Sequence, residues 1–160
     1  MFMLILVVDD ENSLRTLVAE ILSSEGYEVI QASDGLEALE MARQYRPSLI
    51  LSDIMMPHMS GLELITALRQ HPSTASIPVI LLSAAYILPP DQTSRKGVAA
   101  FLAKPFDIAT LAALVEEVSS HHEAQSPVAT EIVHYPPQTL PQEDLASNPD
   151  NPTQDAQTGR

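Results

Sequence analysis

The chain has 160 residues, enough for one folded domain and an appendage. It carries 8 basic and 21 acidic residues, for a formal charge of −13, which argues against direct binding of nucleic acid because phosphate backbones are held by lysine and arginine. It contains no cysteine, which excludes disulfides and thiolate metal sites and favours a cytoplasmic location.

The sequence opens with an apolar run, Met1 to Val8, that Asp9 and Asp10 end abruptly. The run is too short to cross a bilayer and lacks a basic leader. We therefore predict a buried strand, with no signal peptide and no membrane contact.

From residue 1 to about residue 120 the pattern alternates between strands and helices. The strands are expected over 2–8, 27–32, the apolar run that ends at Asp53, 79–82 and 100–103. The helices are expected over 13–24, 34–46, 60–71 and from 107 to about 120. Five such units predict an α/β domain with a doubly wound parallel sheet.

Capping and spacing support these helices. The pairs Asp34 with Glu37 and Ser60 with Glu63 have the spacing of capping boxes. Apolar residues at helical spacing define the expected core faces of the first and last helices; these residues are Leu14, Leu17, Val18, Ile21 and Leu22, then Ile108, Leu111, Leu114, Val115 and Val118.

The segment after the fourth strand is a weak helix candidate. Pro89 and Pro90 forbid an early start, and the polar residues up to Lys96 offer no apolar stripe. We expect a short or frayed helix there.

The composition changes after Ser120. Residues 121–160 hold six prolines and few large aliphatic side chains, and their acidic residues outnumber their basic ones. Such a segment cannot bury enough apolar surface to offset its ordering entropy, so we expect a disordered, proline-rich acidic tail after a domain of residues 1–120. His121, His122 and His134 are assigned to this tail as exposed residues.

Polar residues follow four of the five expected strands. Asp9 and Asp10 follow the first, Asp53 ends the third, Ser83 follows the fourth and Lys104 follows the fifth. Because the carboxyl ends of parallel strands meet at one rim, these side chains should converge there, where open α/β sheets bind ligands.

The residue types indicate a chemistry for this rim. Crowded carboxylates repel one another unless a cation joins them, and an all-oxygen set suits Mg²⁺. A lysine and a hydroxyl beside a metal-bound carboxylate suit a transferring phosphoryl group, which the carboxylate can itself accept.

On these motifs, with Met56, Pro57 and Gly61 after Asp53 and Phe101 to Phe106 around Lys104, the chain resembles the receiver domains of bacterial two-component response regulators. The resemblance covers about residues 1–120. It implies the flavodoxin-like (βα)5 fold with strand order 2-1-3-4-5, and a regulator without a further output module.

The resemblance also implies roles for single residues. Asp53 would be the phosphoacceptor, and Mg²⁺ would be held by Asp10, Asp53 and the backbone carbonyl of Met55, with Asp9 acting largely through water. Ser83 and Lys104 would contact the phosphoryl oxygens.

Two further features come from the same resemblance. The Lys104–Pro105 bond would be cis. Phe101 would be the aromatic residue that turns inward on activation, here without a hydroxyl and so by packing alone.

The implied partners are a sensor histidine kinase or phosphotransfer protein, and a downstream protein bound at the helix 4–strand 5–helix 5 face. A homodimer that forms on phosphorylation is an open alternative. The protein would transfer its own phosphoryl group without being a turnover enzyme.

Other readings of the rim stay open. They are a phosphorelay intermediate, a Mg²⁺-dependent aspartyl-phosphate phosphohydrolase, and an interaction module that no longer takes up phosphate. The phosphohydrolase is disfavoured because such enzymes space their two aspartates two residues apart, whereas Asp9 and Asp10 are adjacent.

Overall fold

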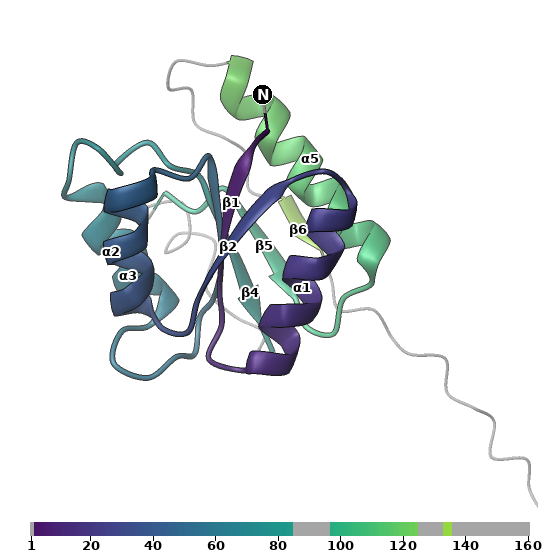
Figure 1. The fold of residues 1–160 in the computed structure, drawn as a ribbon, viewed down its shortest axis with the longest axis horizontal. Helices are drawn as coiled ribbons and strands as arrows, with labels where there is room; N and C mark the ends of the chain where they lie inside the picture. The colour runs from purple at the N-terminus through teal and green to yellow at the C-terminus, as the bar shows by residue number, and fades with distance from the viewer. Residues whose placement is uncertain (1, 85–96, 125–132, 136–160) are drawn as a thin grey trace, which may run out of the picture.

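The computed structural model describes residues 2–84, 97–124 and 133–135 (Figure 1). Its strands are β1 Leu4–Val8, β2 Glu28–Ala32, β3 Leu49–Asp53, β4 Val79–Ser83, β5 Ala100–Ala103 and β6 Val133–Tyr135. Its helices are α1 Asn12–Ser24, α2 Gly35–Tyr45, α3 Gly61–Arg69 and α5 Ile108–Ala124. The weak helix predicted over Pro89–Lys96 lies outside the described residues.

All six strands are parallel and form one sheet in the order β2-β1-β3-β4-β5-β6. The doubly wound fold and the order of the first five strands are therefore confirmed. The sixth strand lies within the segment expected to be a disordered tail, and it is not among the strands predicted from the sequence.

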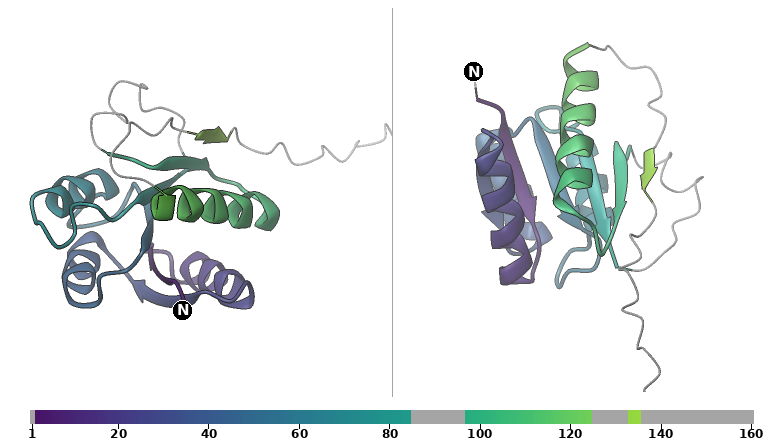
Figure 2. Two further views of the ribbon diagram at one scale, coloured as in Figure 1. Left: turned by 90° about the horizontal axis from the view of Figure 1, so that it is seen from above. Right: turned by 90° about the vertical axis from the view of Figure 1, so that its right-hand side faces the viewer.

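The helices cover both faces of the sheet, as Figures 1 and 2 show. Helices α1 and α5 pack on one face and form one apolar cluster with side chains of β1, β3, β4 and β5. Helices α2 and α3 pack on the other face and form a second cluster. Because both faces are covered, β3 and β4 are buried along their whole length.

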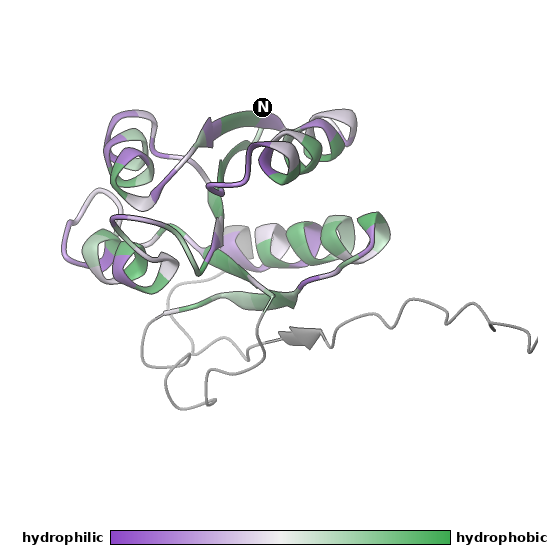
Figure 3. Ribbon diagram, turned by 90° about the horizontal axis from the view of Figure 1, so that it is seen from below, coloured by the Kyte–Doolittle hydropathy of each residue, from purple (hydrophilic) through white to green (hydrophobic). Residues whose placement is uncertain are grey.

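Each helix presents an apolar stripe to the sheet and polar residues outward, as the hydropathy colouring in Figure 3 shows. The prediction that Leu17 and Ile108 belong to these buried stripes is wrong, because Leu17 is 51% exposed and Ile108 is 57% exposed. Leu14 is only half-buried. In the part of the chain that the structure describes, no helix combines the length and hydropathy needed to cross a membrane.

The capping predictions have different outcomes. At α3, Ser60 Oγ accepts a hydrogen bond from the Glu63 N–H, and Glu63 accepts one from the Ser60 N–H, so this capping box is confirmed. At α2, Asp34 caps the helix as expected, but Glu37 accepts from the N–H and hydroxyl of Ser33 instead of the N–H of Asp34.

The last helix is longer than predicted. It runs to Ala124, so His121 and His122 are exposed residues of α5 and not of an irregular tail. The expected boundary at residue 120 thus falls inside a helix.

Candidate functional site

Three carboxylates meet at the carboxyl ends of β1 and β3. Asp9 and Asp10 follow β1, and Asp53 is the last residue of β3. One oxygen from each carboxylate lies within 4.8 Å of the others. Asp9 and Asp53 are buried, whereas Asp10 is exposed. The predicted convergence of these residues is confirmed.

Strand register explains why they meet. Val8 pairs with Ser52, so the residues that follow, Asp9 and Asp53, stand at the same level of neighbouring strands. Asp53 pairs in turn with Leu82 of β4, which places Ser83 one residue further along the same rim.

Lys104 provides the positive charge of the site. Its Nζ lies 3.2 Å from Asp9 Oδ2 and 3.3 Å from Asp53 Oδ2, so it bridges the two buried carboxylates. The Lys104 backbone N–H donates to the Ser83 carbonyl over 2.8 Å, and the Lys104–Pro105 bond is cis as predicted. The two ion pairs and the backbone bond to Ser83 hold this lysine over the rim.

The electrostatics of Asp53 reflect its burial. Burial raises the pKa of the Asp53 carboxyl above its ordinary value, the ammonium of Lys104 lowers it, and the neighbouring Asp9 raises it further. One ammonium faces three carboxylates, so the site retains an excess of negative charge. A bound cation would relieve that excess.

Arg15 is a supporting residue of the site that was not predicted from the sequence. Its Nη1 donates to the Asp9 carbonyl over 2.7 Å and its Nη2 donates to Asn12 Oδ1 over 2.7 Å. The Glu11 N–H donates to Asp9 Oδ1 over 2.9 Å. These bonds fix the turn that carries both aspartates. The only local signal is a basic residue in the second turn of the helix that follows them.

The connection after β3 is closely packed against Asp53. A Cβ at Gly61 would collide with the Asp53 carbonyl oxygen, and the Gly61 N–H donates to the Ile54 carbonyl over 2.9 Å. Only glycine therefore fits where α3 begins beside the site.

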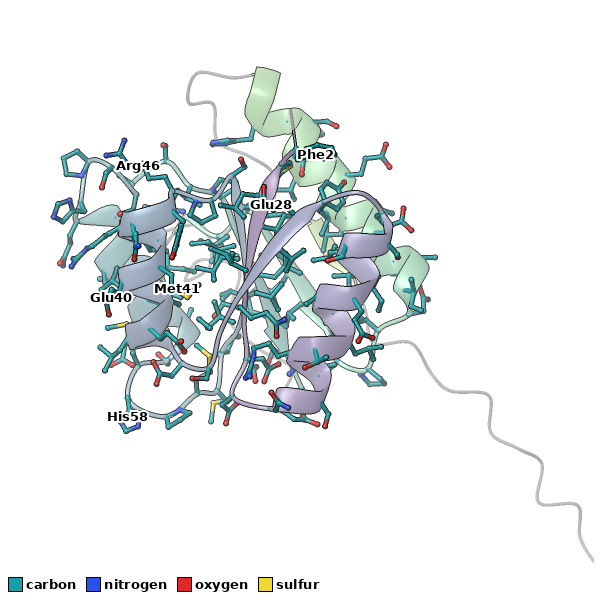
Figure 4. All side chains as sticks on the ribbon, viewed as in Figure 1. Phe2, Glu28, Glu40, Met41, Arg46 and His58 are labelled. Carbon is teal, nitrogen blue, oxygen red and sulfur yellow. The ribbon has the colours of Figure 1, made fainter. Side chains whose placement is uncertain are left out.

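Two residues of this connection are exposed. His58 adopts a left-handed conformation with φ 67° and lies at the periphery of the molecule in Figure 4, at the opposite end from Phe2. The Met55 side chain is 75% exposed, and the ligand predicted there is its backbone carbonyl. That role stays a prediction.

Ser83 and Phe101 occupy the neighbouring strands. Ser83 is buried at the end of β4. Phe101 is already buried, at 7% exposure, among the side chains on the α2 and α3 face. Its ring therefore lies inward, within that apolar cluster.

The donor set decides which cofactor the rim could hold. All three acidic ligands offer carboxylate oxygen, which hard divalent cations such as Mg²⁺ prefer, and the exposed Asp10 leaves one side open to water. Among the described residues, no buried side-chain polar atom lacks a hydrogen-bond partner.

A parallel sheet of this order, with aspartates and a lysine at its carboxyl rim, defines a phosphoryl-signalling domain of the receiver class. The family described as response regulator receiver domain matches residues 5–116. The chain belongs to this family.

Similar proteins agree with the assignment. The polar-differentiation response regulator DivK of Brucella anthropi is 35% identical over 105 residues, which are 65% of this chain and 85% of DivK. The sporulation initiation phosphotransferase F of Bacillus subtilis is 39% identical over 105 residues, 65% of this chain and 83% of that protein. The structure of the chemotaxis response regulator CheY4 of Vibrio cholerae matches with a TM-score of 0.69 and 34% identity, over 74% of this chain and 99% of CheY4.

Proposed function

We propose that Asp53 accepts a phosphoryl group from the phosphohistidine of a sensor histidine kinase or of a phosphotransfer protein. The observation that carries the proposal is the position of Asp53, buried beside two further carboxylates with one oxygen held 3.3 Å from the Lys104 ammonium. Membership of the receiver family makes two-component phosphorelay signalling the setting of this reaction.

The transfer is a displacement at phosphorus. An Asp53 carboxylate oxygen forms the new O–P bond, the N–P bond to the donor imidazole breaks, and the electron pair stays on that nitrogen. The Lys104 ammonium would leave its contact with the Asp53 carboxylate and pair with the oxygens of the transferred phosphoryl group. The Ser83 hydroxyl would donate to one of the same oxygens.

We assign the metal site to Asp10, Asp53 and the backbone carbonyl of Met55, with Asp9 acting largely through water. The chemistry that Mg²⁺ supplies when bound is neutralisation of charge between carboxylates and phosphoryl oxygens. The carboxylate-only donor set and the single lysine support Mg²⁺ over softer metals.

The proposal extends to partners and location. The output surface would be formed by β5, α5 and the segment before β5, and it would bind a downstream protein or a second copy after phosphorylation. Residues 1–120 would suffice for phosphoryl transfer, which would be self-catalysed and without turnover of a substrate. A cytoplasmic location fits the cysteine-free sequence.

Phosphodonor labelling tests this function. Intact-mass measurement after treatment with acetyl phosphate and Mg²⁺ should show one added phosphoryl group, absent in Asp53→Asn and present in the control Asp34→Asn. Equal labelling of Asp53→Asn would remove Asp53 from its role, and no labelling of any form would indicate an interaction module. Sustained phosphate release would indicate the phosphohydrolase instead.

A further inference from the structure

The sheet does not end at β5. Strand β6, Val133–Tyr135, pairs in parallel with its outer edge, with Ala100 opposite Val133 and Leu102 opposite Tyr135. Figure 2 shows β6 beside β5, on the far side from β4. Without β6, β5 would be an edge strand that offers unpaired N–H and C=O groups to any extended chain.

Backbone alternation identifies the groups involved. The Lys104 N–H donates to the Ser83 carbonyl in the register that pairs Ser83 with Ala103, so the N–H and C=O groups of Ala100 and Leu102 face β4, and those of Phe101 and Ala103 face outward toward β6. In the parallel register, Val133 and Tyr135 are then the β6 residues whose N–H and C=O groups face β5. The next N–H on that side would belong to residue 137, which is proline and has none.

The sequence around β6 suits a short strand. Ile132, Val133 and Tyr135 are residues that favour strands, and Pro136 and Pro137 end the run. Residues 121–160 hold few other large apolar side chains. This run is therefore the part of the segment with the composition to add a strand.

The chain connection indicates that the pairing is weakly enforced. Helices α1 and α5 pack on the same face, yet β1 to β2 and β5 to β6 step in opposite directions along the sheet. The connections β1-α1-β2 and β5-α5-β6 therefore have opposite handedness. The connection β3-α3-β4, which crosses the other face of the sheet, has the same handedness as β1-α1-β2. These two connections have the usual right-handed form, so β5-α5-β6 is left-handed. Such connections make up about 2% of parallel crossovers.

A three-residue strand on an unfavourable connection is easily exchanged. Only the eight residues 125–132 separate β6 from α5 in the sequence, so β6 is present at a high effective concentration next to β5. Its pairing with β5 nevertheless consists of a small number of backbone hydrogen bonds. A strand held in this way would keep weakly binding peptides off the edge of β5, and a tightly binding peptide would displace it.

We propose that the outer edge of β5 is a docking site for an extended peptide strand, and that Val133–Tyr135 is its resident occupant and controls access to it. The incoming partner would present an unpaired strand rich in β-branched and aromatic residues, because this is the chemistry of the resident strand. The pairing of β6 with β5 does not depend on phosphorylation of Asp53. Only the use of this edge as an output surface rests on the proposed function.

Amide hydrogen exchange on the full chain, without phosphodonor or Mg²⁺, tests the docking edge. Tyr135→Pro removes the β6 N–H that faces the Phe101 carbonyl, and Ala146→Pro is the matched control elsewhere in the tail. Exchange at Phe101 and Ala103 should accelerate by roughly tenfold or more in Tyr135→Pro and stay unchanged in Ala146→Pro. Unchanged exchange in both variants would overturn the proposal.

A synthetic peptide of residues 129–137 provides the second arm. It should bind the Tyr135→Pro chain and restore protection at Phe101 and Ala103, and it should bind the wild-type chain at least tenfold more weakly. A scrambled peptide should bind neither chain. Equal binding to both chains would contradict a resident occupant, as would a wild-type dimer by native mass spectrometry that the Tyr135→Pro chain does not form. The same exchange contrast is expected in Asp53→Asn, which separates this result from the labelling test of the proposed function.

Discussion

Asp53 is held in a position that disfavours its own charge. It is buried, Asp9 adds a second negative charge, and burial is the main reason that its pKa is raised. A raised pKa means that the unfolded chain gives up this proton at a lower pH than the folded chain does. The ionised carboxylate therefore lowers the free energy of unfolding at neutral pH, and the loss develops as pH rises from the ordinary value of 3.8 through the folded-state pKa.

We accordingly expect Asp53→Asn to raise the free energy of unfolding of the metal-free protein at pH 7, by about 1 kcal/mol on the scale of ordinary single substitutions. Urea denaturation in EDTA from pH 7 toward pH 4 should show the gain shrinking. Glu40→Gln on the exposed side of α2 is the control and should show no comparable pH dependence. A gain that grows toward low pH would contradict the sign of the shift.

Lys104 has the opposite role in the same cluster. Its ammonium contacts Asp9 and Asp53, and Asp9 is 2% exposed. Removing the cation leaves two buried carboxylates facing each other, so Lys104→Met should lower the free energy of unfolding in EDTA by about 1–3 kcal/mol at pH 7.

The double variant Lys104→Met/Asp53→Asn shows whether the cost comes from the carboxylates. If it does, the double variant should recover much of the stability that the single lysine variant loses. Additive losses would instead assign the effect to the packing of the lysine stem.

At the scale of secondary-structure elements, Arg69 ties the end of α3 to the starts of two strands. Its guanidinium donates to the Ile77 carbonyl before β4 and to the Gly97 carbonyl before β5, each over 2.9 Å. Burial lowers the pKa of this guanidinium. The arginine thus holds in place the entry to the strand that carries Phe101 and leads to Lys104.

Arg69→Met keeps the side-chain stem and removes these bonds. We expect it to lower the free energy of unfolding by about 2–4 kcal/mol, because two charged hydrogen bonds are lost. Arg43→Met on exposed α2 is the matched control and should change stability by less than about 0.5 kcal/mol. Equal effects would show that the Arg69 contacts contribute no more than surface charge.

The elements also show what the sequence could predict. The order of strands and helices, the Ser60 cap and the rim aspartates follow from local signals, namely apolar runs, capping pairs and polar residues at strand ends. Burial of Leu17 and Ile108 does not, because helical spacing defines a stripe but not how far each helix overlaps the sheet. Strand β6 is too short for a periodic pattern, and only the edge of β5 makes it a strand.

The residues of the candidate site also divide into those that local sequence signals predict and those that depend on tertiary structure. Asp9, Asp10, Asp53 and Lys104 are visible in the sequence because each follows a strand of a recognisable sheet. The bond from Arg15 to the Asp9 carbonyl depends on how α1 is oriented after the turn, which no local pattern records.

At the scale of the whole molecule, the dominant feature is the net charge of −13. Self-repulsion of this size destabilises the compact state, and salt screens it over a Debye length of about 10 Å at 0.1 M. We expect NaCl to raise the melting temperature of the metal-free protein in a graded way, through screening of the whole surface. This general effect has to be separated from ion binding at the rim.

MgCl₂ at matched ionic strength makes that separation. Occupancy of the Asp9, Asp10 and Asp53 cluster adds stability by mass action, about 2.7 kcal/mol at a hundred times the dissociation constant, which is several degrees for a domain of this size. Asp10→Asn should abolish this excess over NaCl while keeping the NaCl response, since Asp10 is exposed and its loss barely changes the overall charge. Glu20→Gln, an exposed carboxylate on α1, should keep both responses. If Asp10→Asn retained the full excess, the ion would be stabilising the acidic surface as a whole and not the three carboxylates at the end of the sheet.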